Sequence, residues 1–142
     1  MLKPVFLTAQ FYADYSTCSE IEQKSNRPYV CVKIEIDGVQ WAIPMRSHIS
    51  HNYAVWTDKE NHCGIDLTKA VVLEKPAEYI SKVQPHIRKN EFDVLKRINK
   101  STVEQKLRQY IKDYKKAKAA PDAAHNKRLL SFSTLQYFEQ YL

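Results

Sequence analysis

The chain has 142 residues, of which 44% are hydrophobic and 27% charged, and its formal net charge at pH 7 is +6. This composition is typical of one globular domain covering residues 1–142, and it excludes a disordered chain, a collagen and a coiled coil. No apolar run approaches the ~18 residues of a membrane span, and the short apolar start is typical of a strand rather than a signal peptide, so we expect a soluble protein.

The cysteine and glycine contents exclude further classes. The three cysteines form an odd number without a secretion signal, which favours free thiols in a reducing, cytoplasmic compartment. The two glycines of the chain, Gly38 and Gly64, are too few for the glycine-rich loops that hold nucleotide phosphates.

The N-terminal region is predicted to contain a strand and then a short helix. Residues 5–11 alternate weakly between apolar and polar side chains, which favours a strand. The run Thr17-Cys18-Ser19-Glu20 matches a capping box and predicts a helix that continues through Lys24.

A β-hairpin is the clearest local pattern of the sequence. Residues 29–36 alternate regularly, Asp37-Gly38 is typical of a two-residue type I′ turn, and residues 39–45 form the return strand. Pro44 is expected to end regular pairing because proline cannot donate to the ladder. The register puts the apolar side chains on one face, with the pairs Ile36 and Val39, Ile34 and Trp41, and Val32 and Ile43.

The remaining pattern changes from strands to helices. Further strands are predicted at residues 53–56 and 67–73, with a polar loop at 57–64. Helices are predicted at 89–99 and 102–119, and Ser133 is expected to cap a final helix. Residues 117–124 are small and polar enough to be mobile. The predicted class is α+β: a strongly curved antiparallel sheet, forming a β-barrel-like core, with C-terminal helices.

The six residues from Arg46 to His51 combine two imidazoles, two hydroxyls and a guanidinium at a strand end. One interpretation is a zinc site completed by His62 and Cys63, and another is a serine–histidine hydrolase, although no Gly-x-Ser-x-Gly elbow is present. Metal-independent RNA cleavage fits the residue types best, because histidine can act as acid or base and arginine can hold a phosphate. The fourth interpretation is that these are ordinary strand-end residues.

Basic residues are concentrated between Lys82 and Arg128, and a basic domain favours polyanionic partners. Within residues 108–118 they alternate with tyrosines, which indicates either the solvent-facing side of a helix or a nucleic-acid contact. Tyr29, Tyr53 and Trp56 are candidates for stacking on RNA bases, and core packing is the alternative role.

Four segments of the chain together resemble the toxins of type III toxin–antitoxin systems. They are residues 27–30 (RPYV), 42–54 (AIPMRSHISHNYA), 64–72 (GIDLTKAVV) and 132–136 (FSTLQ). They occur in the family's order and at matching intervals, and the nearest branch is TenpN, related to ToxN and AbiQ. At matched positions Ser47 is the family's functional serine, Arg27 replaces a functional lysine, Arg46 replaces a threonine, and Ile49 replaces a lysine.

This resemblance implies a metal-independent endoribonuclease that acts in phage defence. Such a toxin cuts single-stranded mRNA to a 2′,3′-cyclic phosphate and a 5′-hydroxyl, needs no cofactor or metal, and has no membrane partner. A small repeated antitoxin RNA, folded as a pseudoknot, inhibits it within a multimeric protein–RNA assembly. The alternative function is a non-catalytic RNA-binding module that uses the same basic groove.

The expected site residues follow from both lines of reasoning. The catalytic candidates, which bind the scissile phosphate or transfer protons, are Arg46, Ser47, His48 and His51. The RNA-binding candidates are Arg27, Tyr29, Tyr53, Trp56, Lys69, Lys112, Lys115 and Lys116.

Overall fold

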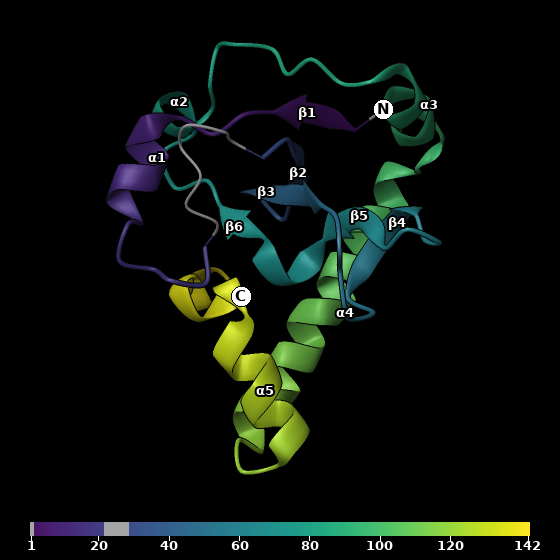
Figure 1. Cartoon of the computed structure of the whole chain (residues 1–142). Helices are drawn as coiled ribbons and strands as arrows, with labels where there is room; N and C mark the ends of the chain where they lie inside the picture. The colour runs from purple at the N-terminus through teal and green to yellow at the C-terminus, as the bar shows by residue number, and fades with distance from the viewer. Residues whose placement is uncertain (1, 22–28) are drawn as a thin grey trace.

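The structure is a computed structural model that describes residues 2–21 and 29–142. Among these residues, six strands form one antiparallel sheet in the order β1-β2-β3-β5-β4, and β6 pairs with β3 beside this path (Figure 1). The strands are β1 (Lys3–Val5), β2 (Cys31–Ile36), β3 (Val39–Arg46), β4 (Ala54–Asp58), β5 (Cys63–Asp66) and β6 (Val71–Val72).

Helix α1 lies between β1 and β2 along the chain, and the other α-helices are in the second half. The α-helices are α1 (Ala9–Asp14), α2 (Pro76–Tyr79), α3 (Lys89–Arg97), α4 (Lys100–Ala119) and α5 (Ala124–Phe132), and the 3-10 helices are η1 (Leu67–Lys69), η2 (Thr134–Tyr137) and η3 (Glu139–Tyr141). The predicted α+β class is confirmed, with an open sheet rather than a closed barrel. Helices α4 and α5 lie side by side and project from the sheet as a helical hairpin (Figure 1).

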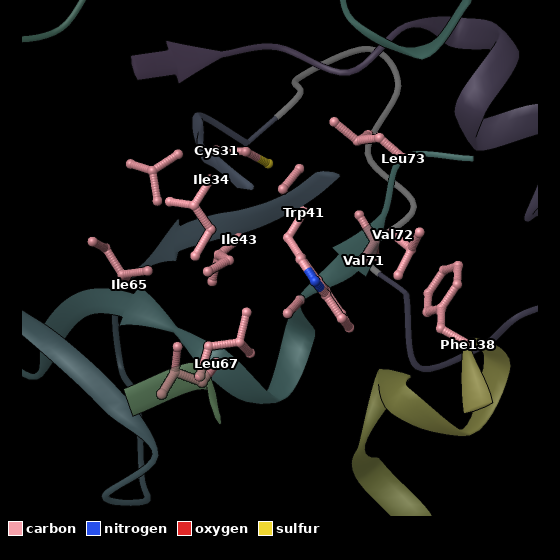
Figure 2. Close-up of a cluster of buried hydrophobic side chains, with 14 of the residues drawn as sticks. Cys31, Ile34, Trp41, Ile43, Ile65, Leu67, Val71, Val72, Leu73 and Phe138 are labelled. Carbon is pink, nitrogen blue, oxygen red and sulfur yellow. The ribbon is translucent and has the colours of Figure 1, made fainter. Parts of the chain in front are cut away.

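The β2–β3 hairpin has the predicted register. Ile36 pairs with Val39, Ile34 with Trp41 and Val32 with Ile43, and their side chains are buried except for Val39, which is half-buried. Figure 2 shows Ile34, Trp41 and Ile43 in the core cluster together with Val72 and Phe138.

The last residues of β3 pair with β5, which lies on the opposite edge of β3 from β2. The paired positions with β2 end at Pro44, but the Met45 N–H still donates to the Val30 carbonyl at 2.8 Å, so hydrogen bonding toward this side continues past the proline. Gly64 lies opposite Arg46, where a Cβ atom would stand 2.6 Å from the carbonyl oxygen of Val55. Only glycine allows β4 and β5 to approach this closely.

Two N-terminal predictions are wrong. Residues 9–11 are helical instead of extended, because the Thr8 side chain accepts from the Phe11 N–H and starts α1 there. Residues 17–21 form turns instead of a helix, since Glu20 reaches the Tyr137 hydroxyl, 2.8 Å away, rather than closing a capping box. Residues 22–24 lie outside the described residues.

The segment from 57 to 73 also differs from the prediction. Strand β5 begins within the predicted loop, at Cys63, and the predicted strand 67–73 is divided into η1 and the short β6. The cause is Asp66, whose carboxylate accepts the Thr68 N–H at 3.0 Å and starts the helical turn. Local hydrogen bonding therefore overrides the apolar run.

The C-terminal helices were only partly predicted. Helices α3 and α4 match the expected ranges within two residues at each end, but the cap of α4 is Asn99 rather than Ser101. Helix α5 was not predicted. The segment 117–124, expected to be mobile, contains the last residues of α4 and the first residue of α5. Ser133 caps a 3-10 helix instead of an α-helix, accepting the Leu135 N–H at 3.2 Å. Within the described residues, no helix combines the length and apolar character needed to cross a membrane.

Candidate functional site

A buried carboxylate, Asp66 at the end of β5, is the centre of a polar network. Its side chain is fully buried, and it accepts hydrogen bonds from Arg46 Nη1 at 2.7 Å and from Thr68 Oγ1 at 2.6 Å. His51 Nε2 lies 3.2 Å from Oδ1, the oxygen that also accepts from Thr68, while Arg46 donates to Oδ2. Arg46 reaches this carboxylate because the end of β3 pairs with β5 opposite Gly64.

The network keeps Asp66 ionised. Burial alone would raise the pKa of this carboxyl, but the hydrogen bonds from His51 and Thr68, together with the Arg46 guanidinium, outweigh burial and hold the pKa below its ordinary value. A buried negative charge therefore balances the arginine. The Arg46 side chain is 27% exposed, so its outer part remains accessible from solvent.

His51 is held by contacts on both ring nitrogens. The backbone N–H of Tyr53 donates to Nδ1 at 3.0 Å, while Nε2 faces Asp66 and lies 3.3 Å from Thr68 Oγ1. A nitrogen that accepts an amide proton carries none of its own, so the neutral ring is the Nε2–H tautomer. The ring also stacks on Phe132, with centroids 6.1 Å apart and planes at 13°. His51 therefore has a fixed position and a fixed tautomer.

Residues near the C-terminus form hydrogen bonds with the turn that carries Thr68. The buried Thr134 hydroxyl donates to the carbonyl of Thr68 at 3.1 Å and also to that of Ala70. The ammonium group of Lys69 donates to the carbonyls of Glu20 at 3.0 Å and Phe132 at 3.3 Å. The turn η1, which carries Thr68 and Lys69, is thus fastened to the end of the chain.

In front of this network is a cleft of about 1110 Å³, between the sheet end and the α4–α5 hairpin. Its cationic lining residues are Arg46, Lys69, Lys116 and Arg128, against one carboxylate, Asp113. With the imidazoles neutral, the lining therefore has a positive charge, which favours an anionic ligand.

The cleft also contains imidazole and aromatic side chains. His51 and Tyr53 lie on the wall formed by the loop between β3 and β4, and His125 and Phe132 lie on the wall formed by α5. Flat rings beside cationic side chains are the combination that single-stranded nucleic acids bind, since bases stack and phosphates pair with cations.

The cleft brings together five of the residues named from the sequence and leaves others outside. Arg46, His51, Tyr53, Lys69 and Lys116 line it. The residues that the structure places elsewhere are Ser47 and His48, both exposed after β3; Lys112 and Lys115, exposed on α4; Trp56, beside His62; and Tyr29, at a separate small apolar cavity. Arg27 lies outside the described residues.

Sequence reasoning missed several members of this site. Asp66 and Thr68 belong to the quoted run 64–72, where a carboxylate between Ile65 and Leu67 in an apolar stretch was a usable signal. His125 and Arg128 had no comparable signal, because their position depends on how α5 packs. Among the described residues, no group of three or more His, Cys, Asp or Glu side chains could hold a metal ion, so His48, His51, His62 and Cys63 do not converge as one would expect for zinc.

Comparisons of the chain with protein-family models, with curated proteins and with solved structures return no match.

Proposed function

We propose that the protein is a metal-independent endoribonuclease that binds single-stranded RNA in the cleft, and that it acts as the toxin of a type III toxin–antitoxin system. The observation that carries the proposal is the cationic cleft in front of the Asp66 network, with four cationic side chains against one carboxylate. The resemblance of four sequence segments to this toxin family supports the cleavage step and the control by an antitoxin RNA.

The proposed reaction is attack by the RNA's own 2′-hydroxyl. The O2′–P bond forms, the P–O5′ bond breaks, the hydroxyl proton moves to a base, and the leaving 5′-oxygen takes a proton from an acid or from water. Arg46, held by Asp66 at 2.7 Å, is the cation that faces the extra negative charge of the pentacoordinate phosphorus. Lys116 and Arg128 bind the strand on the opposite wall.

Proton transfer by His51 has a specific structural requirement. Its Nε2 faces Asp66, so only Nδ1 can accept a substrate proton, and the Tyr53 amide occupies that atom at 3.0 Å. Cleavage through His51 therefore requires the bound RNA to displace this amide. If the amide bond persists, His51 only orients the network.

That occupied nitrogen favours a second candidate function, a non-catalytic RNA-binding module. In this reading the cleft and its cations bind RNA, and the Asp66 network is a rigid support for Arg46. The two candidates share the ligand and differ only in whether the strand is cut.

Incubation of the purified protein with single-stranded RNA in the presence of EDTA tests the proposal. The expected result is cleavage that survives chelation and leaves cyclic-phosphate ends. Lys116→Ala is expected to slow cleavage, and Lys115→Ala, an exposed neighbour outside the cleft, serves as the matched control. Binding without cleavage from about pH 5 to about pH 8, where histidine changes its charge, supports the module instead. Absence of binding contradicts both candidates.

A further inference from the structure

The α5 wall gives the cleft two distinct ends. Phe132, at the end of α5, stacks on His51 and marks the inner end. His125 lies seven residues earlier on the same helix, which corresponds to about 10 Å along the axis at ~1.5 Å per residue. His125 and His51 therefore lie at different positions along the cleft.

The outer end is formed by three basic side chains near the turn between α4 and α5. Lys116 lies close to the end of α4, and His125 and Arg128 lie on the first two turns of α5. All three line the cleft and are exposed. Within the described part of the chain, their side chains make no hydrogen bond or ion pair.

His125 differs from His51 in this respect. Both nitrogens of His51 are engaged inside the protein, whereas the imidazole of His125 is open to the cleft. An imidazole that is open to solvent can take up a proton and become a cation, which an engaged ring cannot do without losing a contact.

The charges around His125 are predominantly positive. From α4, Asp113 and Lys116 line the same cleft, and Arg128 follows on α5 itself. Asp122 is exposed in the turn that precedes α5, and the facing wall contributes Arg46, Lys69 and His51. An added proton on His125 therefore increases an existing cationic field, and its effect on a bound phosphate is attractive.

We propose that Lys116, His125 and Arg128 form a second phosphate subsite for the RNA strand, and that protonation of His125 strengthens binding there. This inference rests on the proposed function, because it takes the ligand to be the single-stranded RNA of the same cleft. It adds that a ligand must contain several phosphodiesters to reach both ends, and that affinity depends on pH through His125.

The test measures binding of a fluorescent, 2′-O-methylated single-stranded RNA, which cannot be cut, at about pH 5.5 and about pH 8, the range in which histidine side chains change their charge. Ionic strength is kept constant, and EDTA is present. The wild-type protein is expected to bind about fivefold more tightly at the lower pH, the effect of one additional charged contact at a partly exposed site. His125→Gln is expected to remove most of this difference. His86→Gln, at an exposed position outside the cleft, is the matched control and retains it.

The outcomes separate this inference from the proposed function. Equal pH dependence in the wild type and in His125→Gln overturns the second subsite while RNA binding itself stands. A wild-type protein that binds the RNA at neither pH overturns the proposed function and this inference with it. Loss of the pH dependence in the His86→Gln control also overturns the role of His125.

Discussion

Arg46 and Asp66 form an ion pair of 2.7 Å in which the carboxylate is fully buried and the arginine borders the cleft. The pair joins the ends of β3 and β5, so it connects the geometry of the sheet to the position of the cation that we assign to the scissile phosphate. Removing one member of a buried pair leaves the other uncompensated, and this makes the pair sensitive to substitution.

Asp66→Asn is expected to lower the free energy of unfolding by about 3 kcal/mol, because Arg46 loses its buried counter-charge. Urea denaturation measures the change. Asp37→Asn is the control, since Asp37 also pairs with an arginine, Arg108, but at an exposed site, and only a small effect is expected there. Equal losses of unfolding free energy in the two variants would show that the buried pair stabilises the fold no more than the exposed pair does.

Stability in acid should depend on Asp66. Its pKa in the folded protein lies below the ordinary value, so its contribution is fully present above the unfolded pKa of about 3.9 and is lost as the pH falls through the folded pKa. The difference in unfolding free energy between wild type and Asp66→Asn should be constant from about pH 5 to about pH 7 and shrink below about pH 4. Urea titrations over this range test it. A difference that grows in acid would contradict the assignment.

Thr134→Val keeps the shape of the side chain and removes the hydroxyl that donates to the carbonyls of Thr68 and Ala70. We expect a loss of about 1–2 kcal/mol in stability, because two buried acceptors lose a donor. Hydrogen exchange should also show that Thr134→Val lowers the protection of backbone amides in η1 more than in the β2–β3 hairpin. Thr102→Val, at an exposed position of α4, is the control, and a similar change there would mean that the Thr134 hydroxyl does not hold η1.

The predictable parts of the fold are those encoded by adjacent residues. The β2–β3 hairpin follows from strict alternation around Asp37-Gly38, which is local information. Helix α5 is different, because its apolar positions are few and its stability depends on burying Leu129 and on packing Phe132 against His51. Such contacts come from distant parts of the chain and leave no periodic signal.

In the candidate site, too, the residues that are close in sequence were predictable and those brought together by the fold were not. Arg46 and His51 were found because they fall in one short run, whereas Asp66, which holds them both, lies 20 residues from Arg46. The roles assigned to Ser47 and His48 remain predictions. His48 adopts φ 57°, a left-handed conformation that turns the chain after β3, so both side chains are exposed away from the cleft lining while Ile49 is buried.

The salt dependence of RNA binding tests the central claim, that the cleft holds the strand, most directly. Each phosphate contact on a single strand contributes a slope of about −0.7 to log K against log salt concentration. The double variant Lys116→Ala, Arg128→Ala is expected to make this slope shallower by about 1.4, since two contacts are lost. The matched pair Lys115→Ala, Lys127→Ala, exposed on the same two helices but outside the cleft, should leave the slope unchanged. Equal slopes for the two double variants would contradict binding in the cleft.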